Sequence, residues 1–198
     1  TNSMRIIHRD DAESIPQGLD VIRNGGVVVY PTDTAYGLGV DAMNRDAVLR
    51  VRQIKGRPDT NPVPIVVSDV KSAQKYVDFS EEAEKLAHAF WPGALTLVLP
   101  SWNQQLSENI GGGGTIGIRV PNEKWLLHLL REIHTPLTST SANKTGDPAQ
   151  YSLHGVKESL GDTAASLIDL WIDGGTLTER PTSTVVQALG EKIEIKRE

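Results

Sequence analysis

The sequence contains no cysteine, and this absence excludes several kinds of chemistry. A chain of 198 residues with zero cysteines can form no disulfide, offers no thiolate nucleophile and cannot build the zinc sites that need sulfur ligands. Cysteine usage therefore leaves the redox compartment open. The five histidines show neither a metal-binding helical spacing nor a neighbouring serine nucleophile motif, so we predict surface or structural roles for them.

Long apolar runs are also missing. No segment approaches the roughly 18 consecutive apolar residues of a membrane-spanning helix, and the first residues lack the basic-then-apolar pattern of a secretory signal. We therefore expect a cytoplasmic protein that does not associate with membranes. Residues 1–3, which precede Met4, are interpreted as a cloning remnant, so the expected unit is one domain over residues 4–198.

Excess positive charge is absent too. The chain carries 20 basic and 25 acidic residues, a net charge of −5, which argues against a surface built mainly to wrap nucleic acid. A local basic cleft remains compatible with that balance. The contents of 38% hydrophobic and 23% charged residues are typical of a globular protein.

Short apolar segments alternate with helical patterns along the chain, and this alternation predicts an α/β fold. The expected strands cover residues 5–8, 27–29, 64–67, 96–99, 115–120, 136–139, 167–172, 183–188 and 192–196. The expected helices cover residues 15–22, 47–54, 81–91, 123–133 and 152–160. We expect Ser80 and Asn122 to cap two of these helices, and residues 102–109 to form a polar loop.

Several of these strands run into loops rich in glycine, serine and threonine, where binding sites are commonly built. These candidate binding segments are residues 32–39, 111–115, 139–146 and 181–184. The pattern Gly112-x-Gly114-x-x-Gly117 imitates a dinucleotide-binding motif, but that motif requires a following helix. Since residues 115–120 are predicted to form a strand, we interpret the glycines as a loop.

The candidate segments supply cations, hydroxyls and an amide, with few acids or bases. The cations are Lys55, Arg57, Arg119 and Lys144. The other groups are Thr32, Thr34, Thr115, Ser139, Ser141, Asn143 and Ser183. Arginine and lysine bind phosphates and carboxylates, and hydroxyls complete their coordination, so this set predicts an anion-binding site.

Some of these residues also fit purely structural roles. Lys55 and Arg57 lie at a helix exit, where they fit equally well as partners of the helix dipole. Arg119 lies between the apolar residues Ile118 and Val120, and a charge there needs a partner if it is buried. Ser183 also fits a simple turn hydroxyl.

Six segments, in order along nearly the whole chain, resemble the YrdC family. They are Tyr30-Pro31-Thr32-Asp33-Thr34-x-Tyr36-Gly37-Leu38-Gly39, Lys55-x-Arg57-Pro58, Trp91-Pro92-Gly93, Gly117-Ile118-Arg119-Val120-Pro121, Ser139-Thr140-Ser141-Ala142-Asn143 and Ser183-Thr184-Val185-Val186. The resemblance implies a YrdC-like twisted mixed sheet flanked by helices, with a concave basic cavity.

The resemblance also implies an activity. Members of the family are nucleotidyltransferases that make threonylcarbamoyl-AMP and pyrophosphate from L-threonine, bicarbonate or CO2, and ATP with Mg²⁺. Their product serves the threonylcarbamoyl-adenosine (t6A) modification of tRNA through a downstream transfer complex. No organic cofactor and no metal held by protein ligands are expected.

The same resemblance assigns roles to individual residues. The predicted catalytic residues are Lys55, Arg57, Ser141 and Asn143. The predicted threonine-binding residues are Thr34, Arg119, Ser139 and Ser183, and the predicted ATP-binding residues are Arg57, Asn61, Thr115, Ser141 and Arg197. We assign Arg119 to the threonine carboxylate and Lys55 with Arg57 to the phosphates. Tyr30 and Tyr36 are interpreted as walls of the threonine pocket, with packing alone as the alternative.

Two other functions remain as alternatives. A structured-RNA or tRNA-binding module would exploit the basic concave face that the family implies, with affinity that falls steeply as salt rises. A carbamoyl-transfer domain of hydrogenase maturation shares the YrdC-like fold. Such domains occur in much larger chains with cysteine-rich zinc modules, which this sequence lacks.

Overall fold

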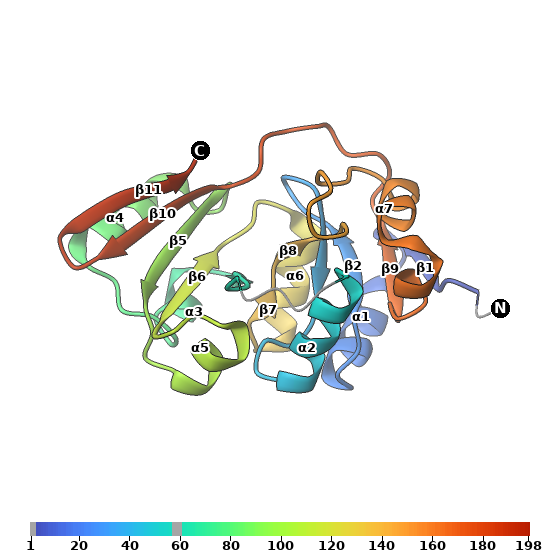
Figure 1. The fold of residues 1–198 in the computed structure, drawn as a ribbon, viewed down its shortest axis with the longest axis horizontal. Helices are drawn as coiled ribbons and strands as arrows, with labels where there is room; N and C mark the ends of the chain where they lie inside the picture. The colour runs from blue at the N-terminus through green and yellow to red at the C-terminus, as the bar shows by residue number, and fades with distance from the viewer. Residues whose placement is uncertain (1–2, 57–60) are drawn as a thin grey trace.

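A computed structural model describes residues 3–56 and 61–198 of the chain. Within these residues it contains two mixed sheets and seven helices, which confirms the α/β class. The five-stranded first sheet lies on the right in Figure 1, where β1, β2 and β9 are labelled, and the six-stranded second sheet extends to β5, β10 and β11 on the left. The expected mixed sheet is thus present as two sheets.

The first sheet has the strand order β1-β9-β2-β3-β8. Its strands are β1 (Ile6–His8), β9 (Leu170–Asp173), β2 (Val28–Pro31), β3 (Tyr36–Gly39) and β8 (Thr140–Ser141). β9 pairs in parallel with both β1 and β2, whereas β3 is antiparallel to β2 and β8. Every residue of β2 is buried, because apolar clusters cover both faces of this strand.

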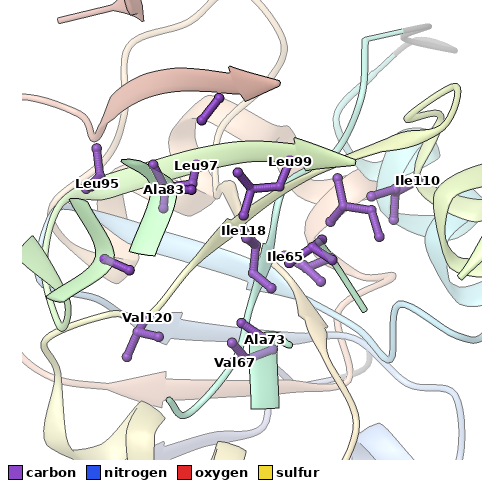
Figure 2. Close-up of a cluster of buried hydrophobic side chains, with 14 of the residues drawn as sticks. Ile65, Val67, Ala73, Ala83, Leu95, Leu97, Leu99, Ile110, Ile118 and Val120 are labelled. Carbon is purple, nitrogen blue, oxygen red and sulfur yellow. The ribbon is translucent and has the colours of Figure 1, made fainter. Parts of the chain in front are cut away.

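The second sheet has the order β11-β10-β5-β6-β4-β7. Its strands are β11 (Lys192–Arg197), β10 (Thr184–Leu189), β5 (Leu95–Pro100), β6 (Thr115–Arg119), β4 (Ile65–Val66) and β7 (Leu137–Thr138). Alternate residues of β5 point to opposite faces. Leu95, Leu97 and Leu99 enter the core shown in Figure 2, together with Ile118 and Ile110, so Thr96 and Val98 face the other side.

Seven helices cover the sheets in the described part of the chain. They are α1 (Ser14–Arg23), α2 (Arg45–Ile54), α3 (Val70–Ala73), α4 (Glu81–Phe90), α5 (Gln104–Ile110), α6 (Lys124–Ile133) and α7 (Leu153–Ala165). Ser80 caps α4, as predicted, by accepting a hydrogen bond from Ala83 N at 3.2 Å. None of the described helices has both the length and the apolar content that crossing a membrane requires.

The prediction of a polar loop over residues 102–109 is wrong, because α5 lies there. Asn103 caps this helix and Gly111 ends it in the left-handed conformation at φ 76°. Leu106 and Ile110 bury its inner face, but two apolar residues gave too weak a periodic signal. The predicted cap Asn122 is also wrong, since Glu123 accepts the hydrogen bond from Leu126 N at 2.8 Å.

The segment 32–39, predicted as a loop, contains the short strand β3, which forms a hairpin with β2. Gly37 and Gly39 leave space for the ring of Tyr30: a Cβ on Gly37 would lie 2.9 Å from Tyr30 Cε2, and one on Gly39 would overlap Cε1. The glycines therefore serve the packing of Tyr30. A strand follows the glycine-rich segment at residues 111–114, as predicted, so no dinucleotide-binding helix forms there.

Candidate active site

A cavity of about 430 Å³ is lined by residues of both sheets. The first sheet contributes the β2–β3 hairpin and β8, and the second contributes β5, β6 and the start of β10. Seven of the predicted site residues line it: Thr34, Thr115, Arg119, Ser139, Ser141, Ser183 and Arg197. The structure thus brings together groups that are up to 163 positions apart in the sequence, from Thr34 to Arg197.

The hairpin connection at residues 32–35 is held by one hydroxyl. Thr32 Oγ1 donates to Ala35 O at 2.6 Å and accepts hydrogen bonds from Thr34 N at 3.1 Å and Ala35 N at 3.2 Å. It also lies 3.1 Å from Thr34 Oγ1. Because Thr32 is only 7% exposed, this local network fixes the orientation of the Thr34 hydroxyl at the cavity.

Arg119 is buried and forms an ion pair. Its Nη1 donates to Asp33 Oδ1 at 2.7 Å and to Gly93 O at 3.4 Å. Its Nε and Nη2 make no hydrogen bond to any residue in the described ranges. The guanidinium therefore has its charge compensated on one side and keeps a two-nitrogen edge for a planar anion.

Ser183 immediately precedes β10 and lines the same cavity. Its hydroxyl is 3.0 Å from Thr96 Oγ1 on β5. The Arg197 guanidinium donates to Ser183 O from Nη2 at 2.9 Å and from Nε at 3.2 Å, and Nη2 also reaches Ser183 Oγ at 3.3 Å. This wall of the cavity therefore consists of one hydroxyl on β5 and one on the residue before β10, joined to an arginine on β11.

Lys55 and Asn143 both donate a hydrogen bond to Ser141 O, and Ser141 lines the cavity. Lys55 Nζ donates to Ser141 O at 2.5 Å, and Lys55 O accepts from Thr145 N at 2.9 Å. Asn143 Nδ2 donates to Lys144 O and Asp147 O, both at 2.9 Å, whereas its buried Oδ1 has no hydrogen-bond partner within the described part of the chain.

The remaining predicted residues are placed differently. Lys55, Asn61 and Asn143 are absent from the described lining of the cavity, and Arg57 lies outside the described residues. The roles of all the predicted site residues stay predictions. Asp33 and Thr96 had no predicted role in the site. Thr96 alternates with core leucines in β5, and this pattern could have marked it as cavity-facing.

The two tyrosines differ from one another. Tyr36 lines the cavity, its hydroxyl donates to Gly175 O at 2.6 Å, and burial raises its pKa above the usual tyrosine value. Tyr30 is fully buried outside the described lining, donates to Thr138 O at 2.9 Å, and has a pKa raised far above its usual value by burial. Tyr30 therefore has the packing role that was kept as the alternative.

The charged residues among the described lining residues are Arg119 and Arg197, which suits a binding site for anions. Basic character of the cleft as a whole stays a prediction. No group of three or more His, Cys, Asp or Glu side chains within residues 3–56 and 61–198 could hold a metal ion. The site is therefore built from cations, hydroxyls and backbone groups.

Comparison with known proteins agrees with these observations. The model of the Sua5/YciO/YrdC family, described as "Telomere recombination", matches residues 20–198. A protein of Pyrococcus abyssi (strain GE5 / Orsay) named threonylcarbamoyl-AMP synthase is 38% identical over 166 residues, covering 83% of this chain and 48% of that protein. One of Bacillus subtilis (strain 168) with the same name is 37% identical over 157 residues, covering 78% and 45%.

The chain spans about half the length of these curated relatives. A solved structure, described as P. abyssi Sua5 complexed with L-threonine, is similar with a TM-score of 0.84 and 35% identity. The similarity covers 94% of this chain and 54% of that one. The fold of the described residues is thus the fold of part of a longer protein that has been crystallised with an amino acid.

Proposed function

This chain belongs to the Sua5/YciO/YrdC family, and we propose that it acts as a threonylcarbamoyl-AMP synthase. In this proposal it converts L-threonine, bicarbonate or CO2, and ATP into threonylcarbamoyl-AMP and pyrophosphate, as a nucleotidyltransferase. The product is an activated carbamoyl donor for t6A formation in tRNA, and a separate transfer complex consumes it. Direct binding of tRNA is not required for this step.

One observation carries the proposal: the free edge of buried Arg119 shares a cavity with hydroxyls from both sheets. A guanidinium edge matches a carboxylate through two parallel hydrogen bonds. Thr34 on one side and Ser139 with Ser183 on the other supply groups for an amine and a hydroxyl. A free amino acid with a hydroxyl side chain has a carboxylate, an amine and a hydroxyl. L-threonine is such an amino acid, and it is the one found with the P. abyssi relative.

The proposed reaction needs no nucleophile from the protein. The threonine amine attacks the carbon of CO2, forms a C–N bond and loses a proton, which gives a carbamate. A carbamate oxygen then attacks the α-phosphorus of ATP, a new P–O bond forms, and the bond to pyrophosphate breaks. Protein cations and hydroxyls act by positioning the two substrates and by stabilising the charge that develops on phosphoryl oxygens.

In this proposal ATP is bound by Arg57, Asn61, Thr115, Ser141 and Arg197, and its phosphates by Lys55 together with Arg57. In this proposal Asn143, beside Lys55 and Ser141, helps to hold the reacting phosphate. Because no acidic or histidine cluster for a metal occurs among the described residues, we derive no step through an ion held by the protein. Mg²⁺ enters in this proposal as part of the MgATP substrate, whose phosphates it coordinates.

Pyrophosphate release tests the proposed reaction directly. The full chain is incubated with MgATP, and pyrophosphate is measured with and without L-threonine and bicarbonate. We expect release only when both are present, and we expect threonylcarbamoyl-AMP in the same samples by mass spectrometry. Pyrophosphate release that ignores threonine, or no release in the complete mixture, contradicts the proposal.

A further inference from the structure

We propose that Arg197 is a positioning residue of the threonine subsite, because it fixes Ser183 at the cavity. The family resemblance assigned Arg197 only to ATP. The inference rests on the proposed function, in which Ser183 contacts threonine. The Arg197 side chain then serves both the threonine subsite and the ATP subsite. Three features of the described structure support it: the register of β11, the contacts of the guanidinium, and the path of the segment that leads to Ser183.

The register of β11 explains why Arg197 faces the cavity. Ile195 pairs with Val186 and Ile193 with Ala188. Both of these β10 residues belong to the core on the helix-covered face of the second sheet, so the two isoleucines lie on that face. A regular strand would place Arg197 on the same face, because side chains repeat every two residues.

The pairing of β10 with β11 is irregular between Val185 and Val186. Arg197 pairs with Val185, and both residues line the cavity. An extra residue in one strand turns the following side chain to the opposite face, and such bulges are frequent beside active sites. The bulge at residue 196 is therefore what directs the guanidinium of Arg197 to the cavity.

The guanidinium of Arg197 forms hydrogen bonds with both the backbone carbonyl and the hydroxyl of Ser183. Nη2 and Nε both donate to Ser183 O, at 2.9 and 3.2 Å, and Nη2 lies 3.3 Å from Ser183 Oγ. When Oγ accepts from Arg197, its own proton is directed to Thr96 Oγ1 at 3.0 Å or to a ligand. Nη1 remains for a phosphate, so Arg197 can hold Ser183 and contact ATP at the same time.

The segment that carries Ser183 crosses from one sheet to the other. Residues 174–183 connect β9 of the first sheet to β10 of the second, and Figure 1 shows this connection running along the top of the molecule. Tyr151 holds the middle of this connection: Leu177 N donates to Tyr151 O at 2.8 Å and Tyr151 OH donates to Arg180 O at 3.0 Å. Arg197 holds the far end, next to the pairing of Thr184 N with Ala94 O.

Two consequences follow from this arrangement. Loss of the Arg197 side chain leaves Ser183 with the Thr96 contact as its one remaining side-chain hydrogen bond among the described residues, so threonine affinity falls even without ATP. In addition, a phosphate bound at Nη1 stabilises the orientation that holds Ser183. ATP and threonine then strengthen each other's binding, and thermodynamic linkage requires the effect to be equal in both directions.

The test compares five proteins by calorimetric titration with L-threonine in the absence of ATP: wild type, Arg197→Ala, Arg197→Lys, Ser183→Ala, and the double variant of Arg197→Ala with Ser183→Ala. Lys192→Ala is the matched control, because this exposed residue at the other end of β11 lies outside the bulge and is absent from the cavity lining. We expect Arg197→Ala to weaken threonine binding about tenfold, the size of one charge-assisted hydrogen bond. Arg197→Lys does not restore it, because an ammonium cannot reproduce the fork.

The double variant decides whether Arg197 acts through Ser183. We expect it to bind threonine as weakly as Ser183→Ala alone, because the second substitution then removes nothing more. Additive losses, or unchanged affinity in Arg197→Ala, overturn the inference. If wild type itself binds no threonine, the proposed function fails. If wild type binds threonine but the variants do not behave as expected, only the role of Arg197 is wrong.

Hydrogen exchange of the ligand-free protein provides an independent readout. We expect the backbone amides of residues 182–184 to exchange faster in Arg197→Ala than in wild type, and Lys192→Ala to match wild type. Equal exchange in all three proteins contradicts the positioning of Ser183 by Arg197, whatever the substrate is.

Discussion

The two walls of the cavity are built in different ways. On the first sheet, Thr32 and its neighbours form a closed turn in which most hydrogen bonds join residues two or three positions apart. At the second sheet, one hydroxyl lies on β5 and one on the residue before β10, and contacts between residues far apart in the sequence hold them: Thr96 with Ser183, and Ser183 with Arg197. We call these the turn wall and the strand wall.

Arg119 joins the two walls. It belongs to β6 of the second sheet, but its ion-pair partner Asp33 lies in the turn wall, 86 positions away. The side chains of the pair are only 5% and 11% exposed. The turn wall is oriented by contacts between neighbours in the sequence, whereas the strand wall depends on long-range contacts. Substitutions far away in the sequence can therefore loosen the strand wall.

Arg119→Ala is expected to have the largest effect, because it removes the residue that joins both walls. Truncating one partner of a buried charge pair costs about 2–5 kcal/mol, so threonine affinity falls at least about 30-fold. ATP affinity stays within a few-fold of wild type. Calorimetric titrations with threonine and with a non-hydrolysable ATP analogue measure both. Arg50→Ala, which breaks the half-buried Arg50–Asp169 pair away from the cavity, is the control.

Equal losses of threonine and ATP affinity in Arg119→Ala would mean that the division of the cavity into two subsites is wrong. A folding defect is checked separately by circular dichroism and thermal unfolding, because unpaired Asp33 destabilises the native state by itself.

Thr32→Val tests the turn wall at nearly constant volume. The buried amide groups of Thr34 and Ala35 lose their acceptor, which lowers the free energy of unfolding by about 1–3 kcal/mol. Because the Thr34 hydroxyl loses its fixed neighbour, threonine binding weakens about tenfold. Urea unfolding and titration measure the two effects. If stability falls while threonine affinity is unchanged, the turn supports the fold only.

Thr96→Val makes the corresponding change in the strand wall. It removes one hydroxyl contact of Ser183 while Arg197 still holds the backbone, so threonine affinity falls only about threefold, at the low end for one neutral hydrogen bond. A larger loss than that of Thr32→Val would reverse the comparison between the walls. The same titration decides it.

Glu123 provides the smallest effect and concerns the support behind the turn wall. This carboxylate caps α6, contacts Arg9 Nη1 at 3.2 Å, and has a pKa that burial raises above the usual glutamate value. The folded state therefore keeps the proton at a pH where the unfolded chain has lost it, so the contribution of this group to stability falls as pH rises through the raised pKa.

Glu123→Gln lacks this titration. We expect the stability of wild type relative to the variant to decrease by about 1 kcal/mol or less between pH 4 and pH 7, measured by urea unfolding. A relative stability that increases over this range contradicts the direction of the pKa shift.

The sequence predicted the α/β class and those parts of the site that local patterns reveal. Arg119 stands out as a charge within an apolar strand, and the threonines after β2 stand out as hydroxyls at a strand end. Ser80 was recognisable as a cap because it is a serine directly before Glu81 and Glu82 at the start of a helical pattern. These features depend on neighbours in the chain.

Features that depend on distant residues could not be predicted. No local sequence pattern predicts the ion pair between Arg119 and Asp33. Likewise, no pattern in residues 192–197 predicts the bulge that turns Arg197 to the cavity. The division into two sheets arises from strand pairing, as between β7 and β4. Helix α5 was missed because its stability comes from packing of Leu106 and Ile110 against the second sheet, and not from a periodic pattern.

The central claim is that the free edge of Arg119 binds the carboxylate of threonine in the cavity between the walls. The most direct measurement compares wild-type binding of L-threonine with that of L-threoninol, which keeps the amine and the side chain but replaces the carboxylate by an alcohol. The account predicts that threoninol binds at least about 30-fold more weakly, as expected when a charged partner is removed. Equal affinities for the two compounds would contradict it.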